Sequence, residues 1–179
     1  MEQFSNWTLA AIRADSPMMT WMEERRFDWV PAAHSAVGNL MRGISFVVIT
    51  DRDREWFADY AVAMLNRSEK KRPLLPIFNA REILPHLDRA SSDEIDLARN
   101  MLSIAFGDRF IYWYIGRGDD ARARAPKKER DSFLWLMDEE AQNGFFLRSA
   151  DHLLDIKLMH LARLLNKTID AAMFGEVTL

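Results

Sequence analysis

The sequence has no cysteine, only seven glycines and no long apolar run. Disulfides, thiolate metal sites and thiol catalysis are therefore excluded. Its uninterrupted apolar stretches are far shorter than the roughly 18 residues that a membrane-spanning helix needs. The segment Met1–Trp7 lacks the basic region and apolar run of a signal peptide, so we expect a cytoplasmic protein without membrane contact.

An excess of positive charge is also missing. Lysine and arginine number 24 against 27 aspartates and glutamates, which leaves a net charge of −3. Nonspecific affinity for nucleic acid depends on contacts between basic side chains and phosphates. We therefore expect no direct DNA binding, and any action on DNA would pass through another protein.

The chain begins with helical patterns. Phe4 and Trp7 share one face at helical spacing, and Ser16-Pro17 is typical of a helix start. A second helix is predicted over Trp29–Met41, with Gly43 at the position of a left-handed cap. Because 179 residues suit one compact domain, we expect residues 1–179 to form a single unit, with 1–43 helical and 44–179 holding a sheet and its covering helices.

After Gly43, short apolar segments alternate with helical ones. Such alternation predicts right-handed crossovers and a mainly parallel sheet. The expected fold is a three-layer α/β/α sandwich preceded by two N-terminal helices. The predicted strands are Ile44–Ile49, Leu74–Phe78, Phe110–Ile115 and Phe145–Leu147, and the predicted helices are Asp53–Asn66, Ser91–Gly107, Phe133–Gln142 and Asp151–Met173.

The loop after the first strand is where such folds bind ligands. It holds Thr50, Asp51, Arg52, Asp53 and Arg54. A phosphate site there would need glycines for close backbone approach, and this loop has none. Its carboxylates would repel a phosphate, and the loop is interpreted as a helix cap with solvated side chains. As alternatives, Arg52 and Arg54 could preserve an anion site, and Asp51 and Asp53 could form an acid/base pair.

Other catalytic or metal-binding patterns are weak. His152 and His160 are eight residues apart on a predicted helix, too far for one metal ion. The serines lack the Gly-x-Ser-x-Gly turn of an activated nucleophile. The segment Arg117–Arg130 mixes both signs of charge and is interpreted as a solvated loop. We therefore expect neither an enzyme nor a cofactor or metal protein.

Several stretches of this sequence resemble the HobA family, which is related to DiaA. They are the strand–loop–helix Gly43–Phe57, Arg72–Leu75 with the strand after it, Ser132–Leu136, Leu153–Leu158, Val177–Leu179, and Phe4-x-x-Trp7. The resemblance implies a fold similar to sugar-isomerase (SIS) domains that has lost its sugar-phosphate chemistry. It also implies a homotetramer built from dimers.

The partner implied by the resemblance is the N-terminal domain of the initiator DnaA. Several copies held on one scaffold would promote initiator assembly at the replication origin by raising its effective concentration. Met173 and Phe174, at the end of the last helix, resemble an apolar pair in DiaA-type relatives and form one predicted contact surface. They could instead pack in a subunit interface.

Arg54 and Trp56 form a second predicted contact surface, because arginine and tryptophan are favoured interface anchors. The alternative function is a phosphosugar-binding or isomerase domain with an altered site at Thr50–Asp53.

Overall fold

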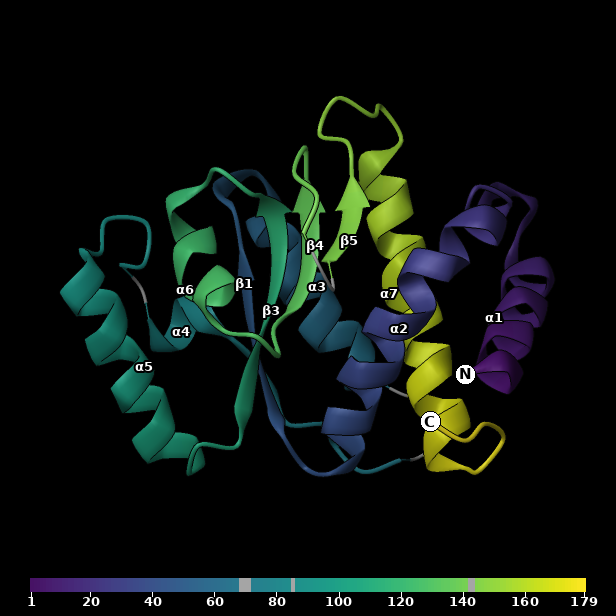
Figure 1. Ribbon diagram of the computed structural model, residues 1–179, viewed down its shortest axis with the longest axis horizontal. Coiled ribbons are helices and arrows are strands. Elements are labelled where there is room, and N and C mark those ends of the chain that lie inside the picture. The colour runs from purple at the N-terminus through teal and green to yellow at the C-terminus, as the bar shows by residue number, and fades with distance from the viewer. Residues whose placement is uncertain (68–71, 85, 142–143) are drawn as a thin grey trace.

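A parallel sheet of five strands forms the centre of the molecule, in the order β2-β1-β3-β4-β5 (Figure 1). The structure is a computed structural model that describes residues 1–67, 72–84, 86–141 and 144–179. Every neighbouring pair of strands runs parallel, which confirms the predicted sheet. The strands are β1 (Ser45–Thr50), β2 (Ile77–Asn79), β3 (Phe110–Arg117), β4 (Phe133–Met137) and β5 (Gly144–Leu147).

Helices cover both faces of the sheet, giving the predicted three layers (Figure 1). One face carries α1 (Glu2–Asp15), α2 (Met22–Met41), α3 (Glu55–Leu65) and α7 (Leu154–Met173). The other carries α4 (Ala80–Ile83), α5 (Ser92–Phe106) and α6 (Arg124–Lys128). Short 3₁₀ turns are η1 (Pro17–Met19), η2 (Arg52–Arg54) and η3 (Ala121–Ala123). Among the described residues, no helix is long and apolar enough to cross a membrane.

The strands are apolar throughout because the sheet is covered on both faces. In β1, Phe46 and Val48 point into the core shared with the N-terminal helices. Val47 and Ile49 point into the second core, beneath α4 and α5. All six residues of β1 are buried. A strand with this environment has no polar face, and its sequence therefore does not alternate.

Aromatic side chains fix the N-terminal helices to the sheet. Trp113 of β3 and Trp135 of β4 lie edge to face, with ring centroids 5.0 Å apart. Trp29 of α2 packs on this pair, 5.6 Å from Trp135. Offset and edge-on aromatic contacts stabilise beyond the area they bury, by about 0.5–1.5 kcal/mol per pair. The helices of residues 1–43 thus pack into the same hydrophobic core as the sheet.

Helix-end signals read from the sequence are confirmed. Ser91 and Glu94 form a reciprocal capping box at the start of α5. Gly107 ends that helix with φ +61°, a left-handed conformation that costs glycine little. Gly43 ends the N-terminal helices with φ +75°. Ser16 accepts a hydrogen bond from the Met18 N–H at the start of η1, 3.2 Å away.

The predicted helix Phe133–Gln142 is wrong. Its first five residues form the interior strand β4, paired with β3 and β5. A short apolar run suits a strand buried on both faces as well as a buried helix, and periodicity alone does not separate them. Gln142 lies outside the described residues.

Three smaller corrections concern element boundaries. The second helix begins at Met22 and carries Pro31 inside it, so its first turns precede the predicted start. The segment Arg117–Arg130, predicted as a loop, contains η3 and α6. The strand β2 begins at Ile77, and the apolar residues before it belong to the connection.

Candidate functional site

The carboxyl edge of the sheet is the place to look for a ligand. The chain leaves β1 toward β2 on one side and then returns to β3 on the other. In open α/β sheets, the crevice at such a reversal point receives ligands. Here the crevice lies between the loop after β1, which forms η2, and the end of β3.

A buried ion pair fills this crevice. The Arg54 Nη1 lies 2.7 Å from the Asp51 Oδ2, and both side chains are buried. The same Oδ2 accepts a hydrogen bond from the Arg117 backbone N–H at 2.8 Å, while Oδ1 accepts from the Arg54 N–H at 3.2 Å. Asp51 is the residue of this loop that caps the turn η2. The carboxylate therefore occupies the backbone donors that a bound anion would use.

Gly116 of β3 shows how closely the crevice is filled. A Cβ at this position would lie 2.8 Å from the Asp51 side chain, so nothing larger than hydrogen fits. Burial raises the pKa of the Asp51 carboxyl, against the lowering effects of the Arg117 N–H and the Arg54 charge. Burial of the Asp51–Arg54 ion pair thus costs desolvation energy, and the pair fills the crevice at the carboxyl edge of the sheet.

The remaining residues of the predicted phosphosugar loop do not converge on a site. Thr50 is buried, and its carbonyl accepts a hydrogen bond from Arg122 at 3.3 Å. Arg52 and Asp53 are exposed. The sequence predicted that the side chains of this loop are solvated. The loop is only partly solvated, because the side chains of Asp51 and Arg54 are buried.

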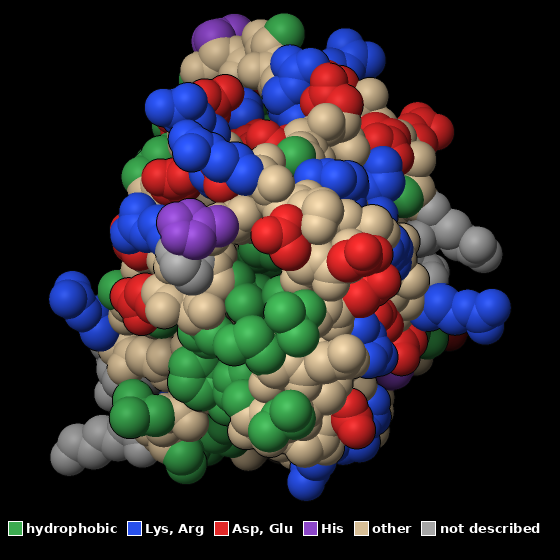
Figure 2. Space-filling model, turned by 90° about the vertical axis from the view of Figure 1, so that its left-hand side faces the viewer, with side chains coloured by type: hydrophobic (Ala, Val, Ile, Leu, Met, Phe, Trp, Pro, Cys, Tyr) green, Lys and Arg blue, Asp and Glu red, His purple; other side chains and the backbone are tan. Residues whose placement is uncertain are grey.

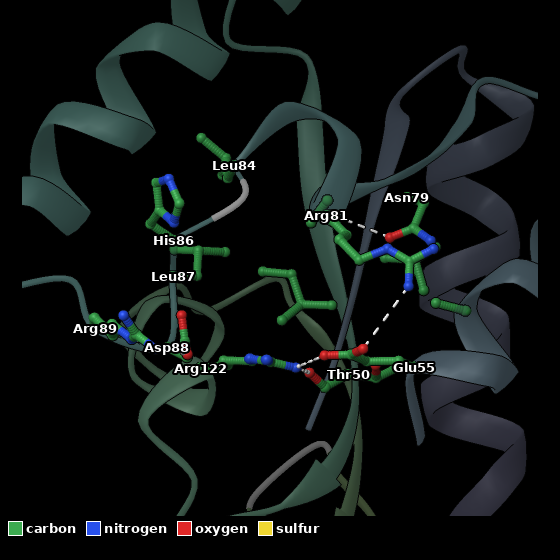
Figure 3. A pocket seen from close by; sticks show the side chains of 14 residues that line it. Thr50, Glu55, Asn79, Arg81, Leu84, His86, Leu87, Asp88, Arg89 and Arg122 are labelled. Atoms are coloured by element: carbon green, nitrogen blue, oxygen red, sulfur yellow. Dashed lines mark hydrogen bonds and ion pairs between the residues drawn. The ribbon is translucent and has the colours of Figure 1, made fainter. Parts of the chain in front are cut away.

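A cavity of about 290 Å³ lies beside this loop, at the ends of β1 and β2. Two arginines reach Glu55 across it, Arg122 at 2.8 Å and Arg81 at 3.7 Å (Figure 3). Arg81 also lies 3.0 Å from Asp59. These guanidinium groups are thus already paired with carboxylates. Within the described part of the chain, no group of three histidine or acidic side chains could hold a metal ion.

The predicted contact surfaces lie at opposite edges of the sheet. Trp56, in the first turn of α3 at the carboxyl edge, is 39% exposed. Its ring contacts Phe57, at 5.6 Å between centroids. Because Arg54 is buried and paired with Asp51, Trp56 is the member of that predicted pair that a partner can reach.

The second predicted surface is at the amino edge, where α7 ends (Figure 1). Phe174 follows the last turn and is 49% exposed, whereas Met173 packs partly against the core. Phe174 is therefore the more accessible member of this predicted pair.

One apolar surface was missed from the sequence. The α5 ridge, defined as Leu97, Met101 and Ile104, is exposed on the outer side of α5. Beside it is the α4–α5 groove, a hollow of about 270 Å³. Figure 2 shows hydrophobic side chains gathered in one patch on this face of the molecule. The i, i+4, i+7 spacing of the ridge was the available signal, since α5 also carries a separate buried face.

The fold and the carboxyl edge of the sheet together define a class of protein. It is a doubly wound α/β domain whose ligand crevice is filled by its own Asp51–Arg54 ion pair. Apolar side chains are exposed elsewhere on its surface. The family model of HobA, a DNA replication regulator, matches residues 1–179. The chain belongs to the HobA family.

A related protein matches this chain over its whole length. The DNA replication regulator protein HobA of Helicobacter pylori is 25% identical, with all of both chains covered. Two crystal structures share the fold: a HobA–DnaA (domain I-II) complex from Helicobacter pylori and HobA from the same organism. The first has a TM-score of 0.78 at 24% identity and covers all of both chains. The second has a TM-score of 0.77 at 23% identity and covers 100% of this chain and 99% of the other.

Proposed function

We propose that this chain is a non-enzymatic scaffold that binds the N-terminal domain of the initiator DnaA and promotes its assembly at the replication origin. The observation that carries the proposal is the HobA family match over residues 1–179. A structure of the same fold is a HobA–DnaA (domain I-II) complex, which supports DnaA as the partner. Binding to DnaA would place the protein in the cytoplasm.

The closed carboxyl edge supports a binding role over sugar-phosphate chemistry. A phosphosugar would need the donors that Asp51 already occupies, including the Arg117 N–H. The Arg54 guanidinium is already bound to the Asp51 carboxylate, which a phosphate would have to displace. A carboxylate at this position also repels a phosphate. The phosphosugar alternative is therefore not favoured.

Assembly would rest on avidity. A homotetramer built from dimers would present several initiator domains at once and raise their effective concentration without new DNA contacts. The net charge of −3 supports an indirect action on DNA, because phosphate contacts would need a basic surface.

The first test is light scattering coupled to size-exclusion chromatography, with this chain alone and mixed with the N-terminal domain of DnaA from its own organism. We expect an oligomer that shifts to a larger complex. Failure to form any complex at tens of micromolar would overturn the proposal.

Two substitutions test the predicted contact surfaces, Trp56→Ala and Phe174→Ala. Truncation of an interface anchor costs about 2 kcal/mol or more, which is a loss of affinity of roughly 30-fold. Phe27→Ala is the matched control, because Phe27 is also an exposed aromatic but lies on α2. If neither test variant binds more weakly than the control, both surfaces are assigned incorrectly, while DnaA binding itself would stand.

A further inference from the structure

A polar cleft lies at the amino edge of the sheet, away from the crevice that Asp51 and Arg54 fill. It is found where α5 turns into β3, beside the start of β4, and its volume is about 240 Å³ (Figure 1). Phe110 and Tyr112 of β3 line it, with 5.4 Å between their ring centroids. The residues that line this amino-edge cleft belong neither to the two predicted contact surfaces nor to the predicted phosphosugar loop.

Acidic side chains outnumber basic ones in the amino-edge cleft. Asp108, Glu129 and Asp131 line it, against one guanidinium, that of Arg99. Arg99 is paired with Glu129, at 2.5 Å between Nε and Oε1. The carboxylates of Asp108 and Asp131 form no ion pair or hydrogen bond with any residue that the structure describes. The cleft therefore holds two carboxylates without a cationic partner.

The end of α5 adds to this negative character. Asp108 directly follows Gly107, the residue that caps the carboxyl end of this 15-residue helix. The last turn of a helix carries partial negative charge and favours cations within that turn. A phosphate or a carboxylate ligand would be repelled here, whereas a positively charged ligand would be attracted.

Two buried hydroxyl-bearing residues also line the cleft. Ser132 is 6% exposed, and its Oγ is buried without a hydrogen-bond partner among the described residues. Burial raises the pKa of Tyr112 to about 12, so its hydroxyl stays neutral at pH 7. A hydroxyl oxygen accepts hydrogen bonds from a donor ligand. Because a buried polar atom without a partner costs free energy, a ligand that donates to Ser132 would remove that cost.

We propose that the amino-edge cleft binds a short alkyl diamine, whose ammonium groups contact Asp108 and Asp131 and donate a hydrogen bond to Ser132. An ammonium group has three donors and no acceptor, which suits a cleft that offers carboxylate and hydroxyl oxygens. The Phe110 ring provides an apolar surface for the methylene chain and a face that attracts a cation.

Size and geometry separate a diamine from other cations. A water-sized group occupies about 30 Å³, so the cleft has room for roughly eight non-hydrogen atoms, enough for a short diamine. A metal ion would need several oxygen ligands converging on one point. No group of three acidic or histidine side chains in the described part of the chain could hold one. Separate carboxylates on two segments instead suit a ligand with two charged ends.

Isothermal titration calorimetry of the full chain with 1,4-diaminobutane, at 0.15 M salt, tests the proposal. We expect saturable binding of one diamine per chain with a Kd of about 1 mM or lower. Asp108→Asn and Asp131→Asn should each weaken binding by about 10-fold or more, because each removes a charge-assisted contact. Asp93→Asn is the matched control, since Asp93 is an exposed aspartate of α5 outside the cleft, and its affinity should be unchanged.

A ligand series and one further variant test the roles of the two charges and of the hydroxyl. 1-Aminobutane, which has one charge, should bind about 10-fold more weakly than the diamine, and 1,4-butanediol, which has none, should not bind. Ser132→Ala removes the buried acceptor with little change in volume and should also weaken binding. Circular dichroism establishes that each variant is folded.

The outcomes that would overturn the proposal are distinct. Absence of saturable binding at about 10 mM diamine would refute the site. Equal weakening in Asp93→Asn and Asp131→Asn would show unspecific attraction between charges. Tighter binding of Mg²⁺ alone, with the same dependence on Asp108 and Asp131, would make this a metal site. Tighter binding of Nα-acetyl-lysine amide than of the diamine would identify the ligand as a lysine side chain of another protein.

Discussion

Replacement of Asp51 with alanine should destabilise the chain by about 3–5 kcal/mol, the usual cost of stranding one charge of a buried ion pair. The Arg54 guanidinium would remain in the interior, 2.7 Å from where its partner carboxylate had been. The exposed Asp53, at 3.5 Å, offers a solvent-screened contact that cannot replace it. The Arg117 N–H would also lose its acceptor.

The double variant Asp51→Ala, Arg54→Met should be much less damaging. It removes both charges, and a buried pair replaced by apolar groups is often close to neutral in stability. The raised pKa of Asp51 points the same way, since burial disfavours its charged form more than Arg54 and Arg117 favour it. We expect the double variant to recover at least about 2 kcal/mol relative to the single one. Asp53→Ala is the control and should change stability by less than about 0.5 kcal/mol.

Urea unfolding followed by circular dichroism measures these differences, with thermal melting as a second readout. For a chain of this size, 3–5 kcal/mol corresponds to a Tm lower by about 6–20 °C. The reasoning would be refuted if Asp51→Ala lost less than about 1 kcal/mol, or if the double variant were no more stable than Asp51→Ala.

Four further predictions concern stability and can be measured by the same unfolding assays. Ser91→Ala should cost about 1 kcal/mol, because it removes the acceptor of the capping box at α5. Gly107→Ala should cost about 1–2 kcal/mol through its left-handed backbone alone, since no atom lies within 4 Å of the added Cβ. Trp135→Ala should cost about 3–5 kcal/mol by opening a cavity in the aromatic core. Burial lowers the pKa of His160, so the unfolded chain binds its proton more readily; stability should fall as pH falls below the ordinary value of 6.5, and His160→Gln should flatten that dependence.

The loop after β1 shows how much of the candidate site can be predicted from local sequence. The absence of glycine and the presence of two carboxylates argued against a phosphate site, and the structure places Asp51 on the donors such a ligand would need. The burial of Arg54 could not be derived in this way, because its partner environment includes the end of β3, more than 60 residues away in the chain. Trp56 and Phe174, predicted from the sequence as contact residues, are both partly exposed, and they belong to helix ends at opposite edges of the sheet.

Local chemistry in the sequence determined the parallel α/β class, the N-terminal helices and most helix ends, because caps, turns and apolar runs depend on neighbouring residues. Only the tertiary structure decided that Phe133–Met137 is a strand, since its helix or strand state depends on pairing with β3 and β5. Tertiary packing also decided which face of α5 is covered. Ile95 and Leu102 meet the sheet, whereas Leu97, Met101 and Ile104 remain exposed, because only one side of a helix can contact the layer beneath it.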